Sequence, residues 1–391
     1  MELPQFSQAE WKLIRKVLIL SVAGSALVVG GTWVFYKIRI ISKVAVEKKR
    51  ADRNSSSTID SIDIAAHRLA ADRFMQTGAA EKAMRHLERL HGLDKKNRQI
   101  TLDLAHAALE AGFYRQALDY YEQLLEKTGS DSVTASQCAR RGIALFYLNR
   151  IDESRSALEQ CVEKFPRNAE AYCFLGQIEA FRGLPSEKAI SCFNRSIAID
   201  STYTEAWYQL ARVYMQQKLY AKARELLLAA VAINPFHSKS HSRLGMVYYY
   251  LDYPELARKS YRTALVLNPY DFNTRYNLGE LLFGVLGDTV AALKEYKLAL
   301  RLNPGLYEAA FKIGIICMRN GMNKEAIGYF EKALSNAPDD VRIMLQCAVA
   351  WEKLDRPEKA AQLYRSILTI DELNGIARQK LKILEQQRTT G

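Results

Sequence analysis

The strongest constraint on the fold is a pattern of about 34 residues that recurs along most of the chain. Its clearest copy is the segment 204–237, TEAWYQLARVYMQQKLYAKARELLLAAVAINPFH. The first half of this copy carries apolar residues at spacings of three and four, namely Trp207, Leu210, Ala211 and Tyr214. This spacing places them on one face of a helix.

The second half of the copy predicts another helix, with Ala223, Leu227 and Ala230 on its inner face. Residues 218–220 form a short break between the two helices. Pro235 ends the second helix because proline lacks an N–H and its ring clashes with the preceding turn. The segment is therefore predicted to form two short amphipathic helices and a stop.

The same marks return in later copies. They are a Leu-Gly or Ile-Gly pair, then an alanine, an aromatic residue, a second alanine and a closing proline: Leu244, Gly245, Ala257, Tyr261, Ala264 and Pro269; Leu278, Gly279, Ala292, Tyr296, Ala299 and Pro304; Ile313, Gly314, Ala326, Phe330, Ala333 and Pro338. The pattern resembles the tetratricopeptide repeat (TPR) family. The resemblance implies an all-α, right-handed superhelical solenoid of helix-turn-helix repeats, with a concave groove for peptides or partner helices.

Nine repeats are expected over residues 64–374. Their bounds are 64–97, 98–134, 135–168, 169–203, 204–237, 238–271, 272–306, 307–340 and 341–374. The first two and the last lack the closing proline, as terminal repeats often do. Residues 375–391 are predicted to form a capping helix and a tail. Because each repeat of a solenoid packs only on its neighbours, a chain of 391 residues needs no single compact core.

Ahead of the repeats, residues 17–36 (VLILSVAGSALVVGGTWVFY) contain no charged side chain. This is the length that a helix needs to cross the hydrocarbon of a bilayer. Trp33 and Tyr36 lie at its far end, where aromatic rings favour the interface. A cleaved signal peptide and a buried helix are the alternatives, but the apolar run is long and basic residues follow it directly. We therefore expect a single-pass membrane helix.

The flanks of this helix predict its orientation. The head, residues 1–16, ends in three cations, whereas the linker 37–63 begins with seven, Lys37, Arg39, Lys43, Lys48, Lys49, Arg50 and Arg53. Positive residues stay cytoplasmic, so the repeats are expected on that side. Much of the net charge of +12 lies before the repeats. This placement favours a membrane surface over nucleic acid as the charged partner.

The sequence contains no pattern of an active site, a cofactor site or a metal site. It lacks GxxxxGK[ST], GxSxG and HExxH motifs, and its six cysteines form no CxxC pair. His237 and His241 are four residues apart but straddle the turn after Pro235, so they need not face each other. The cysteines mostly occupy small apolar positions and are expected to be buried free thiols. We therefore expect no enzyme, no cofactor and no metal.

The resemblance implies that the residues one turn away from the packed face of each first helix line the groove. Aromatic, methionine and charged side chains gather there, a mixture that suits an adaptable protein-binding surface. The candidates are Tyr208, Arg212, Met215, Lys239, Arg243, Met246, Tyr249, Tyr250, Tyr276, Asn277, Glu280, Phe283, Phe311, Lys312 and Met318. About half of them are expected to pack between repeats instead.

Some members of the family hold the C-terminal carboxylate of a chaperone with lysine, arginine and asparagine side chains from three repeats. Lys239 and Arg243 match the last part of that clamp. Gln209 replaces the middle asparagine, and Cys173 and Gln177 replace the first lysine and asparagine. The clamp is incomplete, so binding of a chaperone tail is not expected, although the two cations can attract an acidic segment.

These features predict a membrane-anchored scaffold or adaptor that binds one or more proteins in its groove and recruits or assembles a complex. Homo-oligomers are left open. The order of one membrane helix and nine repeats is also similar to the bacterial lipopolysaccharide assembly protein B family, whose C-terminal metal module with two CxxC pairs is missing here. The alternative function is a secretion, pilus or envelope-polymer assembly subunit with its repeats on the non-cytoplasmic side.

Overall fold

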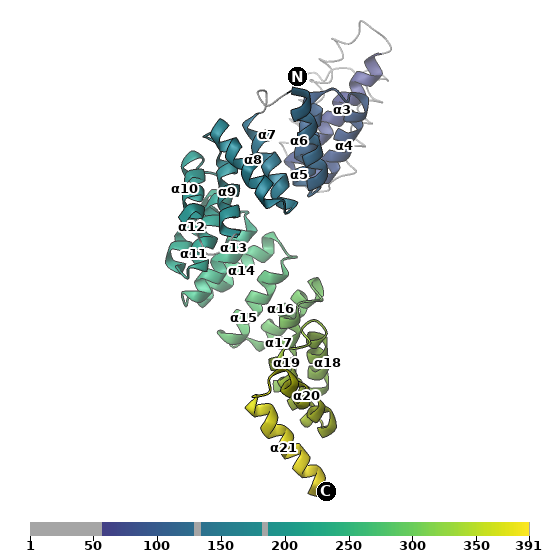
Figure 1. Cartoon of the computed structure of the whole chain (residues 1–391), viewed down its shortest axis with the longest axis vertical. Coiled ribbons are helices and arrows are strands. Elements are labelled where there is room, and N and C mark those ends of the chain that lie inside the picture. The colour runs from purple at the N-terminus through teal and green to yellow at the C-terminus, as the bar shows by residue number, and fades with distance from the viewer. Residues whose placement is uncertain (1–56, 129–133, 182–186, 391) are drawn as a thin grey trace, which may run out of the picture. The chain divides into compact units, whose positions relative to one another are not determined.

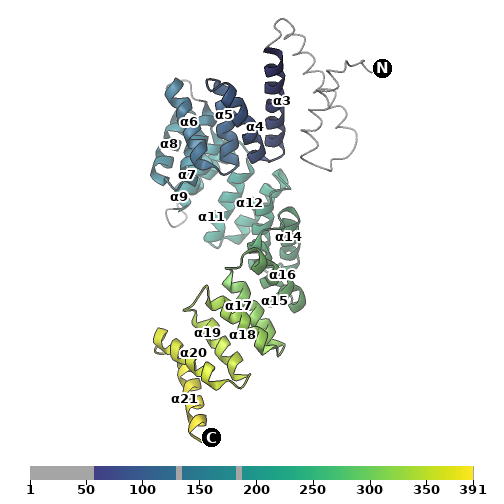
Figure 2. The same ribbon diagram turned by 90° about the vertical axis from the view of Figure 1, so that its right-hand side faces the viewer.

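The structure of the chain is a computed structural model that describes residues 57–128, 134–181 and 187–390. These residues form nineteen helices and no strand (Figures 1 and 2). The helices are α3 Ser57–Gln76, α4 Ala80–Leu93, α5 Arg98–Glu110, α6 Tyr114–Thr128, α7 Ala135–Tyr147, α8 Ile151–Lys164, α9 Ala169–Phe181, α10 Glu187–Ile199, α11 Thr204–Gln216, α12 Tyr220–Ile233, α13 Ser238–Tyr250, α14 Pro254–Leu267, α15 Phe272–Gly284, α16 Thr289–Leu302, α17 Tyr307–Arg319, α18 Asn323–Leu334, α19 Val341–Glu352, α20 Pro357–Ile370 and α21 Gly375–Thr390. The expected all-α repeat solenoid is confirmed.

The chain divides into two compact units, Met1–Arg182 and Gly183–Gly391. Within each unit, a helix packs on the one before it and the one after it, as α13 does on α12 and α14. Each successive pair, such as α11 with α12, supplies the two helices of one repeat.

A missing side chain lets the two helices of a repeat approach closely. An added Cβ on Gly245, Gly279 or Gly314 would lie 2.6, 2.6 or 2.5 Å from the ring of Tyr261, Tyr296 or Phe330. These rings are almost fully buried. The Gly-aromatic pairing in the sequence is therefore a contact between the first and second helix of one repeat.

The turn inside a repeat needs a left-handed backbone. One residue has a positive φ in each turn that the structure describes, and it is glycine at Gly78, Gly112, Gly287 and Gly321. The other turns use Asn149, Lys218, Asp252 and Asp355, with φ between 56° and 61°. The conformation is thus set by the repeat and is imposed even on residues that disfavour it.

The loop between repeats has its own recurring hydrogen bonds. Asn234, Asn268 and Asn303 each accept a bond from the backbone N–H two residues ahead, which forms an Asx turn. A side chain of the next helix then donates back to the loop, over a spacing of six residues. These bonds run from Trp207 to the carbonyl of Ser201 at 3.0 Å, His241 to Pro235 at 2.9 Å, Arg275 to Pro269 at 2.9 Å and Arg378 to Glu372 at 2.7 Å.

The last helix, α21, covers the end of the second unit. Its Ala377 and Leu384 are buried with Tyr364 and Ile367 of α20. Lys380 of α21 also donates to Glu352 of α19 at 2.8 Å. The apolar face of α20 is therefore covered by α21.

No helix among residues 57–128, 134–181 and 187–390 is long and apolar enough to cross a membrane. The predicted membrane helix, 17–36, and the head, 1–16, lie outside the described residues. At the end of the predicted linker, α3 begins at Ser57, seven residues before the first expected repeat. The stretch 57–63 contains neither glycine nor proline to prevent helix formation.

Candidate partner-binding groove

The candidate groove residues all belong to the second unit and come from α11, α13, α15 and α17. Four of them are exposed: Arg212, Lys239, Tyr249 and Tyr250. The exposed fractions of the two tyrosines are 39% and 54%. The Tyr250 ring stacks on Tyr220 of α12, with centroids 4.6 Å apart. These four side chains are therefore accessible to solvent.

The remaining candidates are covered to different degrees. Tyr208 is only 6% exposed, and its ring lies edge-on to His237, with centroids 5.3 Å apart. Five others are half-buried against the core of the second unit: Met246, Tyr276, Phe283, Phe311 and Met318. The half-buried set also includes Met215, Arg243, Asn277, Glu280 and Lys312.

The groove carboxylate Glu280 is neutralised within the protein. It accepts a hydrogen bond from Lys312 at 2.7 Å and another from the hydroxyl of Tyr296. Burial is the main cause that raises the pKa of Tyr296, and the neighbouring Glu280 raises it further. Burial, followed by the same carboxylate, also raises the pKa of Tyr276. Both tyrosines therefore remain neutral donors at physiological pH.

Glu205, which no sequence motif marks, is a second partnered carboxylate. It lies 3.6 Å from His237 Nε2 and accepts a bond from Gln209 at 2.6 Å. Burial alone would raise the pKa of Glu205, but His237, Gln209 and the charge of Lys239 outweigh it and lower the pKa. Sequence spacing gives no clue to the contact between Glu205 and His237, since these residues lie at opposite ends of the repeat 204–237.

A third carboxylate, Glu352 of α19, was also missed from the sequence. It accepts hydrogen bonds from Lys380 of α21 and from Tyr364 of α20, the latter at 2.7 Å. A sequence feature that indicates this contact is Tyr364 at the aromatic position of the second helix. Tyr296 occupies the same position in its own repeat and donates to Glu280. A phenylalanine at that position, such as Phe330, has no hydroxyl to offer.

The cations of α11 and α13 differ from these carboxylates. Among the described residues, Arg212, Lys239 and Arg243 have no carboxylate within ion-pair distance. Arg212 donates to Gln209 at 2.7 Å, and a guanidinium nitrogen of Arg243 lies 3.8 Å from the sulfur of Met246. The three side chains, here called the groove cations, are thus candidate groove residues whose positive charge is not balanced by an ion pair among the described residues.

The histidine pair of the sequence does not face a common site. His237 contacts Glu205 and Ser240, the latter at 2.7 Å. His241 donates to the carbonyl of Pro235. Within the described residues no three His, Cys, Asp or Glu side chains are grouped as metal ligands.

The first unit carries a separate polar cluster on α5, α6, α7 and α9. Arg140 lies 3.7 Å from Glu110 and 3.8 Å from Glu170. The buried atoms His106 Nε2 and Tyr121 Oη have no hydrogen-bond partner in the described part of the chain. Burial, with a smaller effect of Arg140, lowers the pKa of His106 to about 4. His106 is therefore neutral at physiological pH.

Two models of the tetratricopeptide repeat match this chain, one over residues 74–136, 186–242 and 318–382, the other over 140–204 and 242–307. Together they cover well over half of the sequence. Among curated proteins, the chain is 22% identical to the BBSome complex member BBS4 of Bos taurus over 273 residues, which are 70% of this chain and 51% of that protein. It is 32% identical to the uncharacterized protein ycf37 of Cyanophora paradoxa over 73 residues, 19% of this chain and 42% of that protein.

The chain thus spans about half the length of the curated relatives it matches. Among solved structures, the Cut9–Hcn1 hetero-tetramer of the APC/C is similar with a TM-score of 0.57 and 17% identity, covering 85% of this chain and 64% of that one. YrrB, described as a TPR protein with an unusual peptide-binding site, has a TM-score of 0.43 and 20% identity, covering 49% of this chain and 97% of that one. At these identities the likeness concerns the fold alone.

Proposed function

Because the chain belongs to the tetratricopeptide repeat family, we propose that it is a membrane-anchored scaffold or adaptor. Proteins of this family bind protein partners. In the proposal, residues 17–36 hold the chain in a membrane and the groove of the second unit takes a segment of a partner. A preformed helical surface favours such binding because little ordering is needed on association.

The observation that carries the proposal is the imbalance of charge in the groove. Glu205, Glu280 and Glu352 already have donors within the protein. In the described part of the chain the groove cations have no carboxylate within ion-pair distance, so an acidic segment of the partner can supply one. The exposed Tyr249 and Tyr250 lie on α13, both about two turns beyond Arg243. Their rings are available to an apolar residue next to the acidic one.

The relatives support a role in assemblies without naming a partner. BBS4 is named as the member of a complex, and the Cut9–Hcn1 structure is a hetero-tetramer. We extend this to a proposal that the present chain recruits or assembles a complex at its membrane. The similarity to lipopolysaccharide assembly protein B concerns only the order of membrane helix and repeats, and it adds no partner.

Proximity labelling with the full-length protein in its own cells tests the charge argument. The double variant Lys239→Glu, Arg243→Glu should lose the captured partners, because an acidic segment would then meet like charge. Lys324→Glu, Lys332→Glu on α18 is the matched control, since both lysines are exposed and lie outside the groove. An unchanged set of labelled proteins in the groove variant would contradict the proposal.

The aromatic part of the groove has its own test. Tyr249→Ala should weaken capture of the same partners at least fivefold, since a buried aromatic anchor contributes about 1 kcal/mol or more at an interface. Helical circular dichroism should not change, because Tyr249 is exposed. Adding Tyr276→Ala should cost stability as well, since its ring packs beside Tyr296, with centroids 5.7 Å apart. Full capture by Tyr249→Ala would remove this residue from the proposed site.

A further inference from the structure

The outer helices of two neighbouring repeats carry four cations in corresponding places. Lys259 and Arg262 lie on α14, and Lys294 and Lys297 lie on α16, 35 residues further on. Since α14 packs on α15 and α15 on α16, repeating the same arrangement brings these positions to the same side of the second unit. All four side chains are exposed. They are called the basic patch below.

The basic patch is not neutralised by the protein. The only carboxylates on α14 and α16 are Glu255 and Glu295. Glu255 pairs with Arg258, and Glu295 pairs with Arg275 at 2.9 Å. In the part of the chain that the structure describes, none of the four patch cations has a carboxylate within ion-pair distance.

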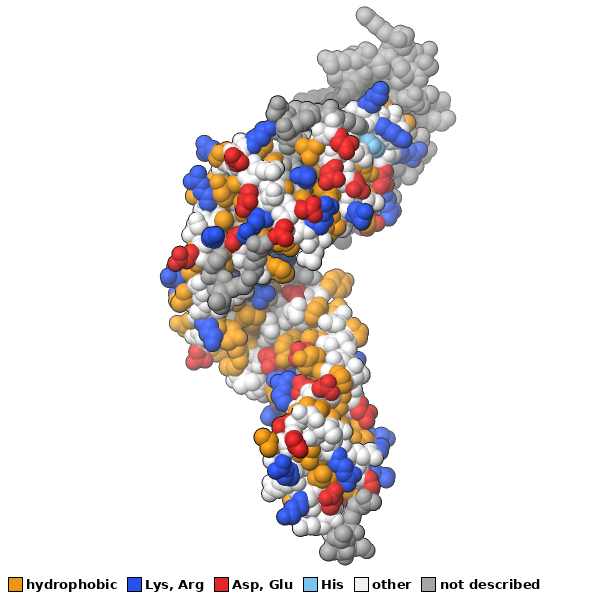
Figure 3. Space-filling view, in the orientation of Figure 1, with side chains coloured by type: hydrophobic (Ala, Val, Ile, Leu, Met, Phe, Trp, Pro, Cys, Tyr) orange, Lys and Arg blue, Asp and Glu red, His pale blue; other side chains and the backbone are white. Residues whose placement is uncertain are grey.

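The patch ends at the neighbouring repeats. The place of Lys259 is taken by Glu225 on α12, and the place of Arg262 by Glu331 on α18. On the face of the second unit that Figure 3 shows, charges of both signs are interspersed. The run of one sign is therefore confined to the pair α14 and α16.

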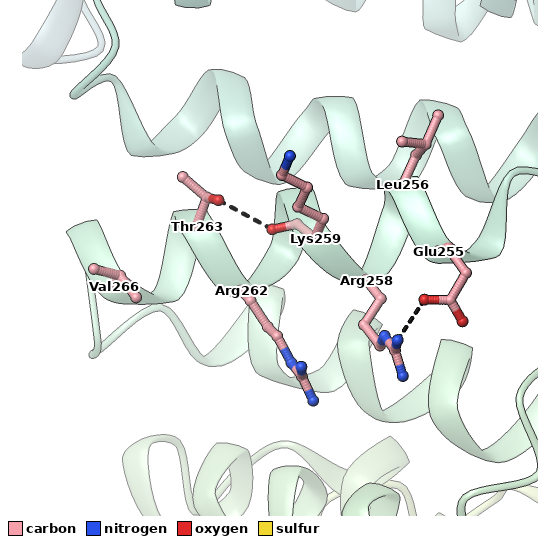
Figure 4. A pocket seen from close by; sticks show the side chains of 7 residues that line it. All are labelled: Glu255, Leu256, Arg258, Lys259, Arg262, Thr263 and Val266. Carbon is pink, nitrogen blue, oxygen red and sulfur yellow. Dashed lines mark hydrogen bonds and ion pairs between the residues drawn. The ribbon is translucent and has the colours of Figure 1, made fainter.

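Exposed aliphatic side chains accompany the cations. Val266 and Val290 are 80% and 82% exposed, and Leu256 is 45% exposed. An open hollow of about 550 Å³ lies over α14 and is lined by Glu255, Leu256, Arg258, Lys259, Arg262, Thr263 and Val266. Figure 4 shows Arg258 and Arg262 extending to one side of the helix, with Leu256, Lys259 and Thr263 on the other. The surface thus combines positive charge with small apolar groups.

We propose that the basic patch rests on an anionic lipid surface and holds the second unit against the membrane. Lysine suits this role because its hydrated point charge attracts headgroup phosphates without requiring a fixed geometry. Valine and leucine side chains can enter the headgroup boundary. Single-stranded nucleic acid is a poorer fit, since the lining of the hollow contains no aromatic ring for a base to stack on.

The inference rests on the proposed membrane anchor, which brings α14 and α16 near a bilayer and raises the effective concentration of lipid around them. The groove remains available in this arrangement because its candidate residues lie on first helices, whereas the basic patch lies on second helices. Partner binding and lipid contact therefore use different elements of the same repeats.

Photo-crosslinking tests the contact. The full-length protein, with a photoreactive amino acid at Thr263, is reconstituted into phosphatidylcholine vesicles with or without phosphatidylserine. Lipid adducts should form on the vesicles that contain phosphatidylserine. Their yield should decrease when the salt concentration rises from about 0.1 M to about 1 M, because the Debye length shortens from about 10 Å to about 3 Å. The same probe at Gly328, an exposed position on α18, is the positional control.

Charge removal identifies the residues responsible. Changing Lys259, Arg262, Lys294 and Lys297 together to Gln should lower the yield of lipid adducts at Thr263 at least about tenfold, because each cation near an anionic surface contributes about a fivefold factor. Changing the exposed lysines Lys324, Lys332, Lys353 and Lys382 to Gln removes equal charge and should leave the yield unchanged.

Two outcomes overturn the inference: equal adducts with and without phosphatidylserine, or adducts to protein only. Extraction of the reconstituted membranes with alkaline carbonate examines the anchor separately. If the chain resists extraction but Thr263 gives no lipid adduct, the patch fails and the anchor stands. If the chain is extracted but lipid adducts still depend on phosphatidylserine, the anchor fails and the lipid contact of the patch is supported.

Discussion

Three glycines of the repeat 307–340 should respond differently to the same substitution. Gly314→Ala should cost about 1–3 kcal/mol, because its Cβ would lie 2.5 Å from the Phe330 ring. Gly321→Ala should cost about 1–2 kcal/mol, because its φ is +75°. Gly328→Ala should gain about 0.5–1 kcal/mol, since it is helical with open space around it. Hydrogen exchange of the amides of α17 and α18 measures the three effects.

Equal effects of Gly314→Ala and Gly328→Ala would contradict the close contact between α17 and α18. The comparison is well matched because the two variants change the same atoms in the same repeat. Only the neighbourhood of the new methyl group differs.

The first unit should show a histidine-dependent loss of stability in mild acid. The pKa of His106 is about 4 in the folded protein and about 6.5 when unfolded, so the unfolded chain binds more protons between these values. The contribution of neutral His106 to the free energy of unfolding is therefore fully present above about pH 6.5. The free energy of unfolding falls by about 2–3 kcal/mol as the pH drops toward 4. His106→Gln should remove this loss, measured as the urea midpoint by circular dichroism at several pH values.

His241→Gln is the control for this experiment, since His241 lies in the second unit and hydrogen-bonds a loop carbonyl. It should retain the acid dependence of the parent. The same dependence in His106→Gln would show that another group is responsible.

Residue type alone explains only part of the site. The Gly-aromatic pairs could be predicted because both residues recur in the sequence at fixed places. The burial of Tyr208 could not, because it depends on His237, which lies at the far end of the same repeat in sequence. Likewise, Lys218 in a left-handed turn has none of the usual sequence marks of that conformation, and only its alignment with Gly321 indicates it.

At the scale of elements, α21 is expected to stabilise the last repeat. Ending the chain after Asn374 would expose the apolar surface that Ala377 and Leu384 cover, at a cost of at least about 2 kcal/mol. The amides of α19 and α20 should then exchange faster. Ending the chain after Gln386 keeps both buried residues and should leave exchange unchanged. Equal exchange in the two truncated chains would show that α21 is dispensable.

The helices themselves were largely accessible from sequence. Apolar spacing and the closing proline predict the pair α11 and α12, whose bounds fall within residues 204–237. The N-terminal part of α3 was less accessible, because residues 57–63 were predicted to belong to the linker whereas they are helical in the structure. A stretch without glycine or proline can form either a linker or a helix, so composition alone does not separate the two.

At the scale of the whole molecule, a change in one unit should remain local. Each helix packs on those adjacent in the chain, so stability is close to a sum of repeat and neighbour terms. Gly314→Ala should therefore speed exchange in the second unit while the amides of α4 and α5 keep their rates. A uniform change across both units would mean that the chain unfolds as one cooperative body.

The bond that spans six residues makes the solenoid modular in a practical sense. Trp207, His241, Arg275 and Arg378 differ in chemistry, yet each has a nitrogen that meets the carbonyl six positions earlier. If the segment 204–237 were duplicated and inserted directly after His237, the indole of its tryptophan would stand six positions after Pro235. It would therefore meet the carbonyl of Pro235. We expect the lengthened chain to fold with one more repeat, whereas a splice shifted by two residues would leave the donor without its acceptor. Evolution by tandem duplication needs such a junction. It tolerates different side chains but not a different number of residues between donor and acceptor.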